Sequence, residues 1–272
     1  MSATNGLPAN IKALILDMDG VLWRDNQTLL DMPAFFSTLK HIGLPVVFAT
    51  NNGTRSIDMY VERLASFGVP VEPWQVVTSA IAVADYLSKK FPHPGPVCVV
   101  GEIGVIDALN QKGFSLAQED EEALAVVAGM DRALTYDKLT QATLLIRSGK
   151  PFIGTNPDLT FPTPRGLVPG AGATLAFLEA ATGVHPIIIG KPEPYLYHFA
   201  IERLGTRPEE TLAVGDRLET DILGGQRAGC PTALVLSGVT TAAEAARWAP
   251  QPDLILPTLA DLLPLLVQHT RL

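Results

Sequence analysis

Acidic, hydroxyl and amine side chains stand directly after four short apolar runs of the sequence. Asp17 and Asp19 lie in "LILDMDGVLW", Thr50 ends "VVFAT", Lys191 follows "PIIIG", and Asp216 follows "TLAVG". Taken singly, each is most simply a polar residue at the end of a strand. Because the carboxyl ends of parallel strands meet at one edge of a sheet, the polar residues at these four strand ends together predict a shared crevice at that edge.

The predicted crevice concentrates negative charge. Asp17, Asp19 and Asp216, together with Asp221, bring up to four carboxylates into it. Without a counter-charge these groups would repel one another and shift towards the neutral form. Mg²⁺ suits sites that offer a few carboxylate or carbonyl oxygens plus water, so the sequence predicts a magnesium site.

The remaining groups of the crevice suit a phosphate. Thr50 offers a hydroxyl, the backbone of "TNNG" offers N–H groups, and Lys191 offers a positive charge. A carboxylate can attack phosphorus and form an acyl phosphate. A second carboxyl group nearby can protonate the leaving alkoxide and then deprotonate the attacking water. Two aspartates separated by one residue fit that division of labour, which predicts phosphoryl transfer.

The apolar runs alternate with helical patterns, which predicts an α/β fold with a mostly parallel, Rossmann-like sheet. The runs are apolar on both faces, as strands covered by helices on both sides must be. Strands of this sheet are predicted at 13–17, 46–50, 186–190, 211–216, 232–237 and 254–257. Helices are predicted at 57–66, 194–203, 219–227 and 242–248.

About 135 residues separate the second predicted strand from the third, far more than one βαβ crossover needs. The segment has its own strand-like runs at 96–100, 124–129 and 152–156, and helical patterns at 103–112, 136–148 and 172–181. We therefore predict a smaller α/β domain at 83–183, inserted into a core domain formed by 1–82 and 184–272.

In their order along the chain, the four blocks resemble the haloacid dehalogenase superfamily of phosphatases. The matching stretches are "DMDG" at 17–20, "ATNN" at 49–52, "GKPEP" at 190–194 and "GDRLETD" at 215–221. "DMDG" alone is a weak signal, whereas all four blocks in order are highly specific. The large insertion and its "GTNPD" at 154–158 resemble class IIA of the superfamily, the branch of the NagD-like proteins and the 4-nitrophenyl phosphatases.

The resemblance implies a role for each acidic residue. Asp17 is expected to be the nucleophile and a metal ligand. Asp19 is expected to be the general acid/base, with its backbone carbonyl on the metal. Asp216 is expected to bind Mg²⁺ directly, and Asp221 to support the site indirectly or through a water. Asp19 also argues against dehalogenase chemistry, since dehalogenases of this fold lack the second aspartate of the first block.

The resemblance also assigns the phosphate-binding groups and the cap. Thr50, Asn51 and Asn52 are expected to hold the transferring phosphoryl group. Lys191 is expected to offset the charge on that group and on Asp17. The inserted domain is expected to be a C2-type cap that closes over the site and selects the substrate.

Three residues of the inserted segment have two interpretations each. Asn156 and Asp158 either face the crevice or form the turn that "TNPD" favours. Arg165 stands in the Pro- and Gly-rich loop "FPTPRGLVPGAG", where it either meets an anionic substrate or is simply solvated.

The predicted function is Mg²⁺-dependent hydrolysis of small phosphomonoesters through an aspartyl-phosphate intermediate. Sugar phosphates, nucleotides, phosphoglycolate and 4-nitrophenyl phosphate are the candidate substrates. Two alternatives stay open. A phosphotransferase or phosphomutase would pass the phosphoryl group to a second alcohol instead of water. A phosphate-ligand sensor would bind without turnover.

Composition limits the partners. The 272 residues carry a formal net charge of −8, which argues against nucleic acid, because nucleic-acid-binding proteins usually present a basic face. The two cysteines have no metal-like spacing, and no apolar run reaches the roughly 18 residues that span a bilayer. No secretory signal is visible, so a cytoplasmic setting is expected. The expected partner is a small phosphorylated metabolite, with a homodimer through the cap as a further expectation.

Overall fold

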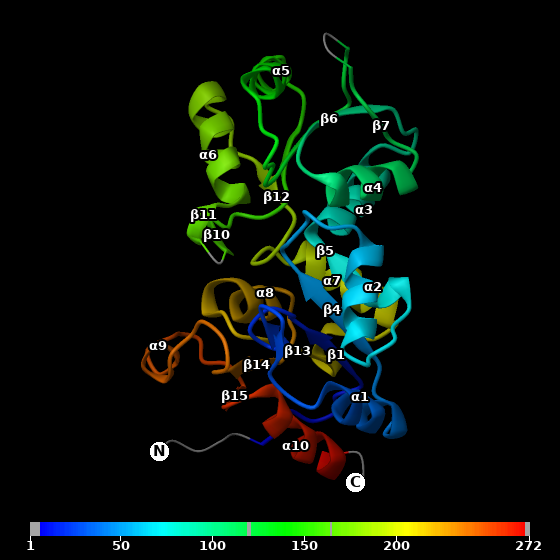
Figure 1. The fold of residues 1–272 in the computed structure, drawn as a ribbon, viewed down its shortest axis with the longest axis vertical. Helices are drawn as coiled ribbons and strands as arrows, with labels where there is room; N and C mark the ends of the chain where they lie inside the picture. Colours follow the sequence, from blue (N-terminus) through cyan, green and yellow to red (C-terminus); the bar gives the residue numbers. More distant parts are fainter. Residues whose placement is uncertain (1–5, 119–120, 164, 270–272) are drawn as a thin grey trace. The chain divides into compact units, whose positions relative to one another are not determined.

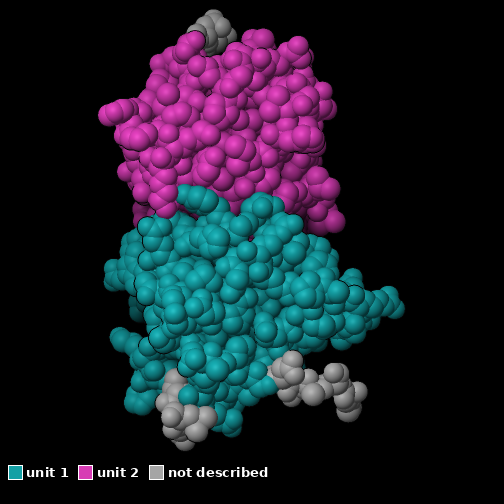
Figure 2. All heavy atoms as spheres, turned by 180° about the vertical axis from the view of Figure 1, so that it is seen from behind, with its two compact units in different colours: residues 1–50, 60–77, 192–272 teal, residues 51–59, 78–191 magenta. Residues whose placement is uncertain are grey.

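A computed structural model describes residues 6–118, 121–163 and 165–269. The chain divides into two compact units, coloured separately in Figure 2. The first unit takes the described residues within 1–50, 60–77 and 192–272, and the second takes those within 51–59 and 78–191. The predicted inserted domain at 83–183 falls within the second unit, and its limits stay a prediction.

The first unit is built on a six-stranded sheet with the order β15-β14-β13-β1-β4-β5 (Figure 1). Every residue of β1, β4, β13 and β14 is buried, as expected for apolar strands covered on both faces. β1 runs parallel to both of its neighbours, with Leu14 opposite Val46 and Leu212. The strands are β1 (Ala13–Leu16), β4 (Val46–Thr50), β5 (Val76–Thr78), β13 (Thr211–Gly215), β14 (Thr232–Val235) and β15 (Leu254–Leu256).

The helices that flank this sheet begin and end at recognisable sequence signals. Asp31 caps the first helix by accepting from the Ala34 N–H at 3.1 Å, and Gly205 ends α7 in the left-handed region. α7 packs on β1 and β4. The helices are α1 (Met32–His41), α2 (Ile57–Ser66), α7 (Tyr195–Leu204), α8 (Leu223–Arg227), α9 (Ala242–Ala245) and α10 (Leu262–His269). A short hairpin, β2 (Trp23–Arg24) and β3 (Gln27–Thr28), follows β1.

The second unit has its own five-stranded sheet with the order β12-β9-β8-β6-β7. Its neighbouring strands run parallel, and their buried residues form one core with the inner faces of α5 and α6. The strands are β6 (Pro96–Val100), β7 (Ser115–Leu116), β8 (Val126–Ala128), β9 (Phe152–Gly154) and β12 (Ile187–Ile188). The helices are α3 (Ser79–Lys90), α4 (Ile103–Gln111), α5 (Tyr136–Arg147) and α6 (Ala171–Thr182).

The predicted fold class, a mostly parallel α/β sheet with a second, smaller α/β part, is confirmed. The prediction was wrong for the run at 186–190, which does not join the main sheet. Its strand β12 pairs with β9 of the second unit instead. An apolar run is equally compatible with either sheet, because only the pairing partner decides which one it joins. Lys191 therefore follows a strand of the second sheet.

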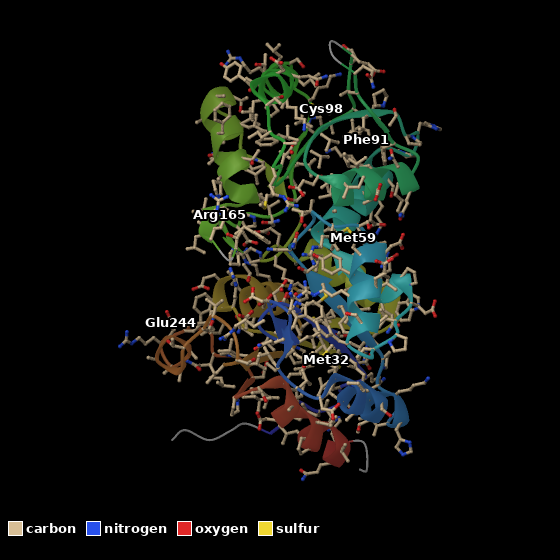
Figure 3. All side chains as sticks on the ribbon, viewed as in Figure 1. Met32, Met59, Phe91, Cys98, Arg165 and Glu244 are labelled. Atoms are coloured by element: carbon tan, nitrogen blue, oxygen red, sulfur yellow. The ribbon has the colours of Figure 1, made fainter. Side chains whose placement is uncertain are left out.

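Two further segments differ from the sequence-based expectation. The Pro- and Gly-rich stretch around Arg165 is an antiparallel hairpin of β10 (Thr160–Thr163) and β11 (Gly166–Pro169), and Arg165 lies exposed at its tip (Figure 3). The predicted helix at 219–227 begins as a π-helical turn, Leu218–Ile222, which continues into α8. Within the described residues, no helix is long and apolar enough to cross a membrane.

A buried carboxylate ties the start of β1 to the start of β13. Lys12 Nζ lies 2.6 Å and Arg207 Nη2 3.0 Å from Glu210 Oε1, and Glu210 is only 6% exposed. The hydrogen bonds from Arg207 and then from Lys12 lower the pKa of Glu210 from 4.5 to about 2. The ionised form is therefore favoured by folding.

Because the pKa of Glu210 is lower in the folded chain, its stabilising effect is complete above pH 4.5 and is lost as the pH falls from there to about 2. We predict that Glu210→Gln flattens the decline of Tm across this window. Thermal unfolding followed by circular dichroism from pH 2 to pH 7 measures it. Glu62→Gln, at an exposed position of α2, is the matched control and should keep the wild-type slope. An unchanged slope in Glu210→Gln would show that protonation of Glu210 does not cause the decline of Tm in this window.

Candidate active site

Two aspartates stand where the strand order of the main sheet reverses. The chain passes from β1 outwards to β4 and β5, and later continues on the other side of β1 with β13, β14 and β15. Asp17 follows β1 and Asp216 follows β13, and the Asp17 N–H donates to the Val214 carbonyl at 2.9 Å. Open α/β sheets bind ligands at such a reversal, beside the carboxyl ends of the strands.

Three carboxylates converge at this point. Asp17, Asp216 and Asp221 each place a carboxylate oxygen within 4.8 Å of the other two. Asp216 and Asp221 are buried, and Asp17 is partly buried. Like charges this close and this poorly solvated are unfavourable without a cation. A set of carboxylate oxygens of this kind fits Mg²⁺, which takes hard oxygen ligands.

Backbone N–H groups orient two of these carboxylates. The Val239 N–H donates to Asp216 Oδ2 at 2.7 Å, and the Arg217 N–H donates to Asp221 Oδ2 at 3.1 Å. The Tyr197 hydroxyl donates to the Asp221 carbonyl at 2.9 Å, which anchors the π-helical turn. Each of the two carboxylates thus has one oxygen held by the protein backbone.

Glycines leave the space that these carboxylates occupy. A Cβ atom at Gly238 would lie 1.9 Å from Asp216 Oδ2, and one at Gly20 would lie 2.5 Å from the same atom. A Cβ at Gly215 would lie 2.1 Å from the Cβ of Asp221. Gly20 also has φ +83°, a conformation that other residues adopt only with strain. The site therefore requires glycine at all three positions.

The side chain of Asp19 is not one of the three carboxylates that converge at this point. Asp19 is an exposed residue, and its Oδ1 accepts a partly buried hydrogen bond from Trp23 Nε1 at 2.8 Å. Thr50, the last residue of β4, is buried. The first unit thus brings Asp17, Asp216 and Asp221 together.

In the second unit, Asn51 and Lys191 are joined directly. Asn51 Oδ1 accepts from the Lys191 N–H at 2.7 Å, and Asn51 Nδ2 donates to the Lys191 carbonyl at 2.9 Å. Lys191 itself is buried. The side-chain amide of Asn51 therefore holds the backbone of Lys191, whereas that of Asn52 accepts from the N–H and the hydroxyl of Thr54.

The "TNPD" stretch supports the same link. Asn156 Nδ2 donates to the Asn51 carbonyl at 2.8 Å, and Asp158 Oδ2 accepts from Asn51 Nδ2 at 3.2 Å. Asn156 Oδ1 also accepts from the Asp158 N–H at 3.1 Å, which is the local turn that the sequence favoured. These side chains form a polar network that fixes Lys191 within the second unit.

Comparison with known proteins identifies the family. The family model for haloacid dehalogenase-like hydrolases matches residues 14–115, and a HAD-hydrolase-like model matches residues 188–262. A 5′-nucleotidase of Bacillus subtilis is 39% identical over 229 residues, 84% of this chain and 88% of its own length. The chain belongs to the haloacid dehalogenase-like hydrolase family. An acid sugar phosphatase of Staphylococcus aureus is also 39% identical, over 85% of this chain and 88% of its own length.

Solved structures place the chain in one branch of this family. NagD from Escherichia coli superposes with a TM-score of 0.85 at 35% identity, covering 93% of this chain and 98% of NagD. A 4-nitrophenylphosphatase from Thermotoga maritima superposes with a TM-score of 0.88 at 36% identity, covering 94% and 97%. The resemblance to the NagD-like, class IIA branch is thereby confirmed.

Sequence reasoning missed two parts of this hydrolase site. The loop after β14 supplies the Val239 N–H and Gly238, and Ser237 Oγ donates to the Gly20 carbonyl at 2.8 Å. Its signal was present, because "SGVT" also follows a strand that ends at the same sheet edge. Trp23 was the other omission, because no sequence pattern shows that its indole N–H donates to Asp19 Oδ1.

We predict that Gly238→Ala displaces the Asp216 carboxylate and weakens cation binding. If Mg²⁺ binds the wild-type protein, a concentration near 100 times its dissociation constant should raise Tm by about 5 °C or more. In Gly238→Ala this rise should shrink or disappear. Gly6→Ala is the matched control, because a Cβ at Gly6 meets nothing within 4 Å. An unchanged rise in Gly238→Ala would show that the steric argument is wrong.

A second prediction concerns the link between Asn51 and Lys191. Asn51→Ala removes two hydrogen bonds to the Lys191 backbone and one to Asp158, so it should destabilise the folded protein by about 2 kcal/mol. Denaturant unfolding measures the change. Asn110→Ala, at an exposed position of α4, should change stability far less. Equal effects of the two substitutions would contradict the anchoring role of Asn51.

Proposed function

We propose that this protein hydrolyses small phosphomonoesters with Mg²⁺, through an aspartyl-phosphate formed on Asp17. By its family it is a phosphatase, as predicted from the sequence. One observation supports the roles of Mg²⁺ and of Asp17 more than any other. It is the convergence of the Asp17, Asp216 and Asp221 carboxylates at the reversal of strand order.

The residues around that point fit the proposed metal. Asp17 and Asp216 would hold it with carboxylate oxygens, and Asp19 with its backbone carbonyl. Asp221, whose carboxylate oxygen lies within 4.8 Å of those of Asp17 and Asp216, would support it indirectly or through a water. The bound ion would neutralise the carboxylates and the phosphate that they face. Glycines 20, 215 and 238 keep the space around these carboxylates clear of other side chains.

The proposed reaction has two steps. In the first, an Asp17 carboxylate oxygen bonds to phosphorus while the ester oxygen leaves with a proton from Asp19. In the second, Asp19 takes a proton from a water as that water attacks phosphorus, which releases phosphate and regenerates Asp17. Because phosphoryl transfer depends on positioning and charge, the phosphoryl group needs donors and a cation around it. We assign these tasks to Thr50, to the backbone of Asn51 and Asn52, and to Lys191.

The substrate class is a small phosphorylated metabolite. The relatives are named a 5′-nucleotidase, an acid sugar phosphatase and a 4-nitrophenylphosphatase. We propose that sugar phosphates, nucleotides, phosphoglycolate and 4-nitrophenyl phosphate are the compounds to compare by kcat/KM. The second unit is the proposed cap that selects among them, and pairing of two chains through it remains a prediction.

The decisive variant is Asp17→Asn. We predict that it lowers kcat for 4-nitrophenyl phosphate by about 10³-fold or more, because an amide oxygen is a poor nucleophile for phosphorus. Chelation of Mg²⁺ should abolish wild-type turnover and its return should restore it. Asp58→Asn, at an exposed position, is the matched control. Full activity in Asp17→Asn would exclude Asp17 as the nucleophile.

Two measurements distinguish the alternatives. Acid quenching during turnover of a labelled substrate should trap phosphate on the peptide that contains Asp17, whereas a phosphate-ligand sensor would trap none. Turnover in ¹⁸O-water should place one solvent oxygen in each phosphate released. Transfer to an added alcohol in preference to water would instead favour a phosphotransferase.

A further inference from the structure

We propose that Trp23 is a positioning residue for phosphoryl transfer, and that its indole N–H holds the Asp19 carboxylate ready for proton transfer to the leaving group. The inference rests on the proposed function, in which Asp19 is the general acid/base. The role of Trp23 is supported by contacts within the first unit.

The local backbone brings the two side chains together. After β1 the chain turns tightly: the Leu22 N–H donates to the Met18 carbonyl at 2.8 Å, and the Gly20 N–H donates to the Trp23 carbonyl at 2.7 Å. Asp19 and Trp23 form an isolated bridge across this turn. Trp23 Nε1 then lies 2.8 Å from Asp19 Oδ1, which is the geometry of a good N–H···O hydrogen bond.

The indole ring is immobilised on its other sides. Trp23 is fully buried, with 0% of it exposed, and its ring centroid lies 5.5 Å from that of Phe67. The Arg63 guanidinium stands over the ring at 4.6 Å, and Arg63 also donates to the Asp25 carbonyl. Rotation of the ring would leave a buried N–H without a partner, which is unfavourable. The direction of the N–H is therefore set by packing.

The fixed indole N–H of Trp23 restricts the side chain of Asp19. Asp19 is exposed, and a carboxylate at such a turn would otherwise rotate among several side-chain conformations. The bond from Trp23 holds Oδ1, and among the described residues no other hydrogen bond to this carboxylate is present. Oδ2 is thus left to exchange a proton, with its direction determined by the bond at Oδ1. Proton transfer is effective only from a group held within hydrogen-bonding reach of the leaving oxygen.

A positioning role predicts a dependence on the leaving group. Phenolate is a poor leaving group that needs a proton from Asp19, whereas 4-nitrophenolate is stable enough to leave without one. Phenyl phosphate and 4-nitrophenyl phosphate are nearly the same in shape, so binding differs little between them. Displacement of Asp19 should therefore slow the hydrolysis of phenyl phosphate selectively. A general structural defect would slow the hydrolysis of both compounds equally.

The test is Trp23→Phe, which removes the N–H and keeps an aromatic ring. We expect kcat/KM for phenyl phosphate to fall by about 10-fold or more, and kcat/KM for 4-nitrophenyl phosphate to fall by less than about 3-fold. Trp248→Phe is the matched control. The Nε1 of Trp248 is buried without a partner among the described residues, so its removal should leave both values unchanged. Equal losses for the two substrates in Trp23→Phe, or no loss, would overturn the proposal.

Asp19→Asn separates this proposal from the proposed function. It should slow phenyl phosphate more than 4-nitrophenyl phosphate in the first step. If it does not, the acid/base role of Asp19 fails, and the role of Trp23 fails with it, whereas the proposed hydrolysis through Asp17 is judged separately by Asp17→Asn. If Asp19→Asn is selective and Trp23→Phe is not, only the role of Trp23 fails. Should Trp23→Phe not fold, 3-benzothienylalanine at position 23 keeps the bicyclic ring without the N–H, and the same selective loss is required of it.

Discussion

The repulsion among three carboxylates is the constraint on which the rest of the first unit depends. Asp17, Asp216 and Asp221 lie within 4.8 Å of one another at a sheet edge, two of them buried. Such a group is tolerated only where a cation and fixed dipoles offset its charge. The surrounding structure supplies the dipoles: the N–H groups of Val239 and Arg217 each point at one carboxylate oxygen.

The same constraint explains the small residues around the site. Gly20, Gly215 and Gly238 come from the loops after β1 and β14 and from the end of β13, yet all three approach the same two carboxylates. A side chain at any of them would displace Asp216 or Asp221. Close packing therefore determines the position of the charges as firmly as hydrogen bonding does.

In the second unit, side-chain hydrogen bonds hold the backbone of Lys191 in place. Lys191 follows the two-residue strand β12, too short to define its position. The Asn51 side chain bonds both the N–H and the carbonyl of Lys191, and Asn156 and Asp158 in turn bond Asn51. Hydrogen bonds that share one partner in this way restrict the conformations of all the side chains in the network.

The sequence by itself determined the fold class, the family and the phosphatase class, because apolar strand runs and short motifs are local signals. Only the tertiary structure decided that 186–190 pairs with β9, that Asn51 holds the Lys191 backbone, and that the loop after β14 completes the carboxylate site. Strand partners and hydrogen-bond partners far apart in the chain leave no local pattern. Trp23 is the instructive case, because the direction of its indole N–H follows from packing against Phe67 and Arg63, residues about 40 positions away in the chain.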